Sequence, residues 1–176
     1  MIGLPRSSIY HAFILFTFTR GLKDGFLGFD LKTKTATIYD SGDTVANFSM
    51  LDAVGQATVG ILAHPAETAN RYVFINSLRT TQNDILNALE TVTGEKWNIK
   101  KTTCEEESRL GREMMEKGDW SGVGHAIMGA SYSGGKYDFT LGRELDNQLL
   151  GVPHLEDLEK TVELIVNEKG KESAQQ

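Results

Sequence analysis

The stretch GFLGFDLKTKTATIYDSG, residues 25–42, decides how the first half of this chain folds. Its glycines allow either a loop that cradles a phosphate or the entry to a β-hairpin. After a turn at 33–34, Ala36 and Ile38 alternate with polar residues, as in a strand with one buried face. We therefore predict a hairpin over residues 29–39.

The glycines of this stretch then have conformational roles. Gly25 ends the helix-like stretch YHAFILFTFTRGLKD, and Gly28 allows close backbone approach where the first strand begins. A Rossmann dinucleotide fingerprint needs G-x-G-x-x-G between a strand and a helix, and Gly21, Gly25 and Gly28 lack that spacing. The stretch GVGHAIMG at 122–129 lacks both the spacing and a preceding strand. No phosphate-binding loop is predicted.

Length and composition predict one globular domain. The chain has 176 residues, 40% of them hydrophobic, which suffices for one sizeable core. Its formal net charge is −6 and its 18 Lys and Arg residues are scattered, so nothing electrostatic supports a nucleic-acid partner. Cys104 is the single cysteine, so the chain has no internal disulfide. A chain without disulfides is compatible with a reducing compartment. We predict a cytoplasmic protein.

The apolar stretch SSIYHAFILFTFTR at residues 7–20 has two interpretations. Arg6 ahead of an apolar run is typical of a secretory signal, but the following TRGLKDG offers no small-x-small cleavage site. The run is also far shorter than the roughly 20 residues that span a bilayer. We favour a buried core segment and expect no membrane partner.

Helix start signals and apolar periodicity predict the other elements. Three residue pairs have capping-box spacing: Ser49 with Asp52, Thr81 with Asp84, and Thr103 with Glu106. Periodicity predicts helices over 50–63, 81–93 and 155–167 and strands over 71–76 and 96–101, with two more helices from Thr103 and in DWSGVGHAIMGASYSGG. The predicted buried face of the 50–63 helix consists of Val54, Thr58, Ile61 and Leu62. A polar tail from Lys169 is expected to be disordered.

Reactive side chains form no catalytic or metal-binding motif in the sequence. Cys104 follows a helix N-cap, where the helix dipole lowers the pKa of a thiol, but the glutamates at 105–107 oppose that effect. Because no orienting base is identifiable nearby, a structural cysteine is favoured over a nucleophile. The four histidines, His11, His64, His125 and His154, lie far apart in the sequence, so no metal site is predicted.

A resemblance to a known family extends these predictions. The stretches GLKDGFLGFDLKTKTATIYDSGDT and LDAVGQATVGILAHPAETANRYVFINSLRTTQNDILNALETVTGEKW resemble the C-terminal half of the NmrA-like family, which includes isoflavone reductase-like and phenylcoumaran benzylic ether reductase-like oxidoreductases, particularly in fungal forms. The similarity covers residues 20–170. The order of hairpin, HP helix end, RYVFI strand and TTQNDIL helix is specific as a set.

The resemblance implies an α+β or α/β fold: the C-terminal substrate-binding lobe of an NmrA-like NAD(P)-binding fold, with the N-terminal Rossmann domain missing. It divides the chain into a divergent apolar segment (1–19), the lobe (20–168) and a disordered tail (169–176). In that family the glycine-rich fingerprint and the catalytic lysine lie in the N-terminal half. We therefore assign no catalytic and no cofactor-binding residue. Intact members use NAD(P)H, but this chain is expected not to bind NADPH or NADH measurably.

Two functions follow from the resemblance. The first is the substrate-binding portion of an NAD(P)H-dependent oxidoreductase, inactive without the dinucleotide domain. The alternative is a non-enzymatic NmrA-like regulator or a module that binds a ligand or protein. The first implies a small, often aromatic substrate, lined by Phe16, Phe18, Met128 and Tyr132. Without the dinucleotide domain, Phe13, Phe16 and Phe18 are expected to be exposed and to mediate self-association.

Overall fold

The computed structural model describes residues 8–10, 18–134, 138, 140–152 and 157–174. The chain forms two compact units rather than the single domain expected from its composition. Unit 1 comprises residues 1–18, 47–79 and 139–156, and unit 2 comprises residues 19–46, 80–138 and 157–176. The chain passes repeatedly from one unit to the other, and no change in composition marks these passages.

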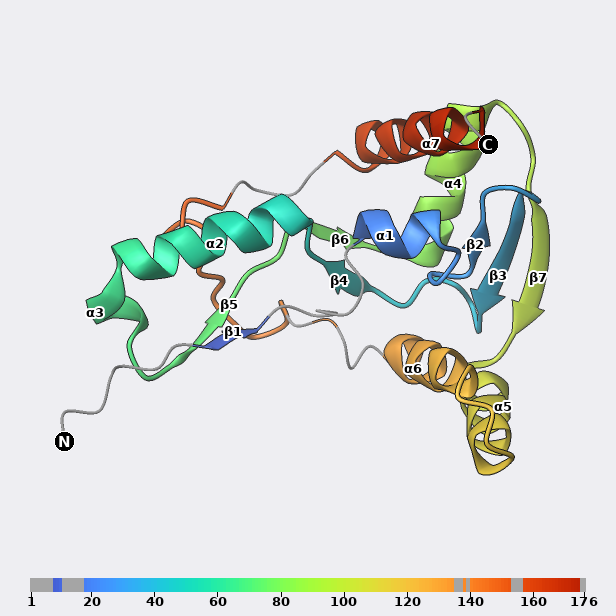
Figure 1. Ribbon diagram of the computed structural model, residues 1–176, viewed down its shortest axis with the longest axis horizontal. Helices are drawn as coiled ribbons and strands as arrows, with labels where there is room; N and C mark the ends of the chain where they lie inside the picture. Colours follow the sequence, from blue (N-terminus) through green and yellow to red (C-terminus); the bar gives the residue numbers. More distant parts are fainter. Residues whose placement is uncertain (1–7, 11–17, 135–137, 139, 153–156, 175–176) are drawn as a thin grey trace. The chain divides into compact units, whose positions relative to one another are not determined.

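Unit 2 contains a three-stranded sheet (Figure 1). β2 (Phe29–Asp30) and β3 (Thr35–Tyr39) form the predicted antiparallel hairpin, and β7 (Asn98–Thr102) pairs with β3 in parallel. The helices of this part of the chain are α1 (Phe18–Lys23), α4 (Gln82–Thr93), α5 (Cys104–Glu116), α6 (Gly122–Tyr132) and α7 (Leu158–Ala174). Ala36 and Ile38 are buried, which confirms the predicted face of the hairpin.

Gly28 has the conformational role predicted for it. Its φ of +92° lies in the left-handed region, and a Cβ atom there would lie 2.7 Å from the carbonyl oxygen of Thr37. The buried side chain of Gln82 then joins the hairpin to α4. Its Oε1 accepts from the Tyr39 N–H (2.9 Å), and its Nε2 donates to the Thr37 carbonyl (3.0 Å).

Two of the three predicted capping boxes are confirmed. Thr81 with Asp84 caps α4, and Thr103 with Glu106 caps α5. The third is wrong: α2 (Leu51–Ala63) begins at Leu51, and its N-cap is Met50 rather than Ser49. Asp52 is therefore at the second position of the helix, one residue short of the position from which a side chain returns to the N-cap.

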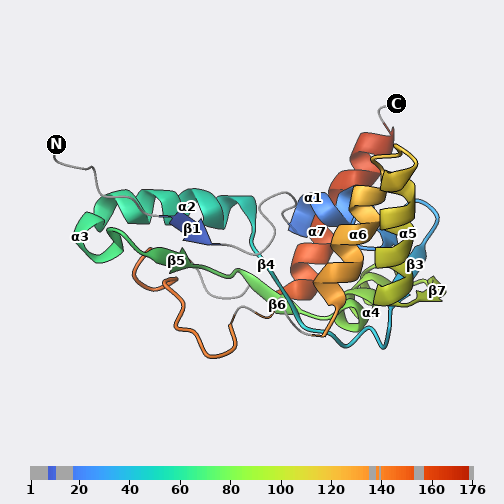
Figure 2. The ribbon, with the colours of Figure 1, turned by 90° about the horizontal axis from the view of Figure 1, so that it is seen from below.

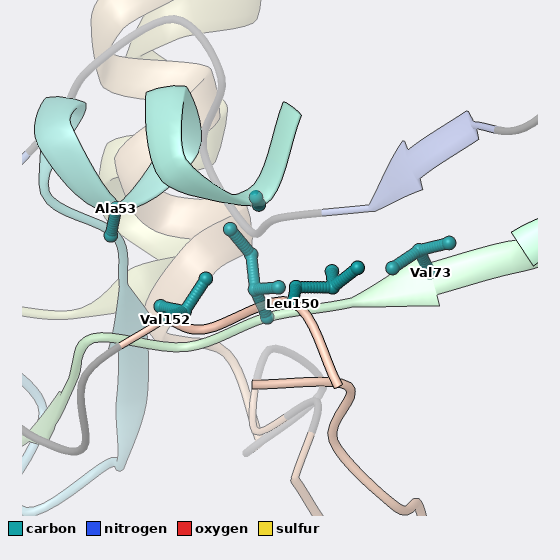
Figure 3. Close-up of a cluster of buried hydrophobic side chains, with 6 residues drawn as sticks. Ala53, Val73, Leu150 and Val152 are labelled. Carbon is teal, nitrogen blue, oxygen red and sulfur yellow. The ribbon is translucent and has the colours of Figure 1, made fainter. Parts of the chain in front are cut away.

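Unit 1 contains a two-stranded parallel sheet formed by β1 (Ser8–Tyr10) and β5 (Tyr72–Phe74). α2 runs along this pair (Figure 2), and α3 (Pro65–Thr68) follows α2. Beneath α2, Leu150 and Val152 pack with Val73 of β5 (Figure 3). This apolar cluster is the core of unit 1.

The buried face of α2 differs from the predicted one. Of the predicted residues, Val54 and Ile61 are half-buried and pack against the core, whereas Thr58 is exposed and Leu62 is 77% exposed. The buried residues are Ala53, Ala57 and Gly60. The reason is the close approach of another backbone, because a Cβ atom at Gly60 would lie 2.6 Å from the carbonyl oxygen of Leu150.

Polar side chains connect separate segments within unit 1. The Asn76 N–H donates to Asn147 Oδ1 (3.1 Å), and Asn147 Nδ2 donates to the Asn76 carbonyl (2.7 Å). Arg71 forms a bidentate contact with Asp146, whose carboxylate also accepts from the Phe74 N–H (2.9 Å). Asn76 and Asn147 are buried, so these hydrogen bonds satisfy polar groups that water does not reach.

Other elements differ from the prediction at their ends or were not predicted. β5 spans only three residues of the predicted 71–76 strand, and its Tyr72 is 60% exposed. β4 (Ala46–Phe48), β6 (Leu78–Thr80) and α3 were not predicted, because three or four residues carry too little periodicity. α7 continues to Ala174, so the tail expected to be disordered from Lys169 is helical over these residues. Lys, Glu and Ala in that tail favour helix.

The apolar N-terminal segment is described only in part. Phe13 and Phe16 lie outside the described residues, so their predicted exposure stays a prediction. Phe18 is fully buried, with its ring edge-on to Phe48 at 5.3 Å between centroids, so the expectation that it lacks partners is wrong. Among the helices that the structure describes, none has the length and apolar character needed to cross a membrane.

Candidate functional site

A groove of about 630 Å³ lies within unit 2. One wall is the hairpin, which contributes Thr35, Thr37 and Tyr39, and the other is formed by α5 and α6. Because residues of a strand alternate between its two faces, these three side chains lie opposite the buried Ala36 and Ile38. The volume falls in the range of pockets that bind small molecules.

His125 of α6 and Glu107 of α5 form a close pair in this groove. Nδ1 of His125 lies 2.6 Å from Oε2 of Glu107. The side chain of Glu107 is only 12% exposed, whereas that of His125 is 41% exposed. Both side chains line the groove, and the imidazole is the more accessible of the two groups.

The close packing of α5 and α6 holds this pair together. A Cβ atom at Gly111 would lie 2.5 Å from the Gly122 carbonyl oxygen, and one at Gly129 would lie 2.6 Å from the Cys104 carbonyl oxygen. Only glycine allows the two backbones to approach so closely. Gly122 and Gly129 of GVGHAIMG thus allow close contact between the two helices, whereas Gly124 lines the groove.

This packing also bears on the dinucleotide that the resemblance implies. Pyrophosphate binding needs glycine-rich backbone between a strand and the N-terminus of a helix. In unit 2, Gly122 and Gly129 face α5, and Gly25 and Gly28 lead into the hairpin. These glycines do not fit the pyrophosphate of NAD(P)H. In the described part of the chain, no three His, Cys, Asp or Glu side chains form a group that could hold a metal ion.

Tyr39, which lines the groove, stacks on Tyr132, which does not. The rings of Tyr39 and Tyr132 are 5.4 Å apart between centroids and inclined by 16°. Burial raises the pKa of the Tyr39 hydroxyl above its usual value, and the neighbouring Glu107 and Cys104 raise it further. Burial likewise raises the pKa of Tyr132. Tyr39, which lines the groove, therefore keeps its proton at neutral pH and offers an aromatic surface without charge.

The four predicted substrate-lining residues occupy different places. Met128 lines the groove, and Tyr132 lies behind it against Tyr39. Phe18 is buried in unit 1 and does not line this groove, and Phe16 lies outside the described residues.

Sequence reasoning missed Tyr39, Glu107 and His125 as groove residues. A signal was present in α6, because His125, Met128 and Tyr132 are spaced by three and four residues and share one helix face. No local signal relates Glu107 to His125, because they lie on different helices.

Cys104 is buried at the start of α5. Burial raises the pKa of its thiol to about 12, and contact with the Asp40 carboxylate contributes in the same direction. The Cys104 N–H also donates to Asp40 Oδ1 (3.2 Å). These effects exceed the lowering that the helix dipole would cause, and they support the structural interpretation of this cysteine.

We expect Cys104 to be almost inert toward alkylation in the folded protein. A thiol with a pKa near 12 carries roughly 10³-fold less thiolate at pH 8 than one with a pKa near 9. Iodoacetamide at pH 8 should therefore label Cys104 in the native chain at least roughly 10³-fold more slowly than in urea. Intact-mass measurements over time give both labelling rates. Asp40→Asn should speed native labelling. Equal rates in buffer and urea would contradict the assignment.

The chain is similar to fungal oxidoreductases. No family model matches it. The oxidoreductase poxI of Penicillium oxalicum is 33% identical over 129 residues, which are 72% of this chain and 41% of poxI. The oxidoreductase aprR of Aspergillus flavus is 35% identical over 112 residues, 64% of this chain and 38% of aprR. The chain thus spans about two fifths of the length of these curated relatives.

Solved structures identify the fold. A nucleoside-diphosphate-sugar epimerase of Staphylococcus aureus superposes with a TM-score of 0.57 at 15% identity, over 84% of this chain and 49% of the epimerase. The triphenylmethane reductase of Citrobacter sp., complexed with NADP(H), superposes with a TM-score of 0.56 at 17% identity. The match covers 81% of this chain and 48% of the reductase. An NADPH-dependent quinone oxidoreductase of Escherichia coli superposes with a TM-score of 0.56 at 13% identity. The match covers 84% of this chain and 52% of the oxidoreductase. The chain therefore has a mixed α/β fold that corresponds to about half of such proteins.

Proposed function

We propose that this chain provides the substrate-binding part of an NmrA-like, isoflavone reductase-like NAD(P)H-dependent oxidoreductase, and that the groove of unit 2 holds the substrate. The observation that carries the proposal is the groove itself, which combines an aromatic and apolar surface with the His125–Glu107 pair. Two observations on the chain support the reaction class. The chain is similar in sequence to proteins named oxidoreductases, and it shares its fold with an NADPH-dependent oxidoreductase and an NADP(H)-bound reductase.

The groove residues suit a small aromatic molecule. Phe26, Tyr39 and Met128 offer two aromatic rings and a thioether, which make favourable contacts with a flat ring. The hydroxyl groups of Thr35 and Thr37 lie on the same hairpin wall as Tyr39 and can orient a polar substituent. The groove thus combines an apolar surface for binding with polar groups for orientation, as in most small-molecule sites.

NAD(P)H supplies a hydride in oxidoreductases of this kind. Because Gly25, Gly28, Gly122 and Gly129 do not fit its pyrophosphate, we propose that the chain by itself binds an aromatic ligand but reduces nothing with NADPH. The groove residues then bind and orient the substrate, exclude water from one side of its ring, and hold a proton at His125.

The test follows the methyl resonance of Met128 in the full-length chain during titration with indole, a neutral aromatic probe. We expect indole to shift the Met128 methyl resonance and to leave that of Met114, on α5 and outside the groove lining, unchanged. Calorimetry with NADPH should show no heat of binding. Micromolar NADPH binding, or an indole response at Met114 and not at Met128, would contradict the proposal.

A further inference from the structure

We propose that His125 is the specificity-determining residue of the groove: Glu107 holds its imidazole with the proton on Nδ1, so that Nε2 accepts a hydrogen bond from the ligand. The ligand class that follows is a neutral aromatic ring bearing an N–H or O–H donor. This inference rests on the proposed function, because it names what the same groove selects.

The tautomer follows from the chemistry of the contact. A carboxylate offers only acceptors, so the proton shared across the 2.6 Å contact between His125 and Glu107 belongs to Nδ1. In the neutral form of the imidazole, the lone pair then lies on Nε2, at the far side of the ring from the carboxylate. A carboxylate that holds a histidine in one tautomer is a recurrent way to fix which nitrogen faces a ligand.

The packing of the two helices keeps this arrangement in place. The side chain of Glu107 is only 12% exposed, and close contacts at Gly111 and Gly129 limit how far α6 can move relative to α5. The side chain of His125 lines the groove and is 41% exposed. Of its two ring nitrogens, the one that Glu107 leaves unoccupied is therefore the one that a ligand can reach.

The surroundings favour a neutral ligand rather than an anion. Lys100 lines the groove, but so do the carboxylates of Asp30 and Glu107. Asp30 accepts from the backbone N–H groups of Lys32 and Thr33, and these hydrogen bonds lower its pKa, so its negative charge is present at neutral pH. With cationic and anionic groups both present, the groove has no excess positive charge to attract an anion.

The aromatic part of the ligand class comes from the neighbours of His125. Met128 lies three residues further along α6 and shares its helix face, and Tyr39 stands on the facing hairpin, backed by Tyr132. A ring held between Met128 and Tyr39 brings a donor on its edge toward Nε2. An aliphatic alcohol would make the hydrogen bond without these ring contacts.

The experiment compares indole with 1-methylindole, which has the same ring system without the N–H donor. In the full-length chain, titration of the Met128 methyl resonance should show indole binding at least 10-fold more tightly. His125→Gln should reduce this preference to less than 3-fold. The matched control is His64→Gln, because His64 is also 41% exposed and lies 3.6 Å from Glu67, but outside the groove. The control should keep the full preference.

The role of Glu107 has its own spectroscopic measurement. The ¹⁵N chemical shifts of His125 should show the Nδ1–H tautomer in the unsubstituted chain, and Glu107→Gln should shift the population toward Nε2–H and weaken the preference for indole. Glu107→Asp should retain the tautomer at least in part. A carboxylate that only supported the packing of α5 would leave the ¹⁵N shifts unchanged.

The outcomes separate the inference from the proposed function. If indole and 1-methylindole bind at Met128 with equal affinity, the inference fails and the proposed function stands. If neither binds there, the proposed function fails as well. A preference for indole that persists in His125→Gln, or an Nε2–H tautomer in the unsubstituted chain, overturns the assignment of His125. The tautomer measurement needs no variant, so it decides the question even where His125→Gln does not fold.

Discussion

Replacing Gly111 by alanine is expected to lower the free energy of unfolding of unit 2 by about 1–3 kcal/mol. A Cβ atom at this position would lie 2.5 Å from the Gly122 carbonyl oxygen and 2.6 Å from the Ala126 backbone nitrogen. Both are backbone atoms, so α5 and α6 have to separate to relieve the overlap. The urea midpoint of unfolding measures the effect, and displacement of His125 should also weaken indole binding.

The matched control is Gly55→Ala in α2, where a Cβ atom would meet nothing within 4 Å. Because alanine favours helix over glycine, we expect this variant to be more stable by about 0.5–1 kcal/mol. The opposite signs of the two alanine substitutions distinguish backbone overlap from helix propensity. Stabilisation by Gly111→Ala would show that close approach of α5 and α6 is not what Gly111 provides.

Replacing Asn147 by leucine is expected to lower the stability of unit 1 by about 2–4 kcal/mol. The side chain of Asn147 is 3% exposed and satisfies both the N–H and the carbonyl of Asn76. Leucine has nearly the same size but neither donor nor acceptor, so both backbone groups lose a buried partner. Hydrogen exchange of the Asn76 amide measures the loss directly.

The neighbouring Gln148→Leu provides the control, because Gln148 is exposed and its side chain holds no buried backbone group. We expect its effect on stability to stay within about 0.5 kcal/mol, as for most surface substitutions. If Asn147→Leu leaves the Asn76 amide as well protected as Gln148→Leu does, then the hydrogen bonds of Asn147 do not stabilise this segment.

Local hydrogen bonds and local alternation explain what could be predicted from the sequence. The capping boxes at Thr81 and Thr103 need only a side chain and a backbone group three residues apart. The hairpin at 29–39 needs only a turn and a period of two, and Gly28 follows from the close approach of the Thr37 backbone where the first strand begins. Each of these features is complete within a dozen residues, so no distant segment can alter it.

Features that depend on a distant segment were predicted poorly. Of the face of α2 that was expected to be buried, Val54 and Ile61 pack against the core but Leu62 does not, because the backbone near Leu150 approaches α2 closely at Gly60. Cys104 was correctly interpreted as structural, but the helix dipole and neighbouring glutamates were weighed for it, whereas mainly burial and Asp40 raise the pKa of its thiol. Phe18 was expected to lack partners, but Phe48, from a strand that was not predicted, covers it.

The features of the candidate site likewise fall into those set by local sequence and those set by contacts between distant segments. The sequence by itself determined the hairpin face that carries Thr35, Thr37 and Tyr39, and it indicated Met128 through the family resemblance. The tertiary structure alone decided that this face meets α5 and α6 across a groove and that Glu107 contacts His125 there. The physical reason is distance along the chain: strand alternation acts between neighbours, whereas the His125–Glu107 contact exists only because glycines let two separate helices pack closely.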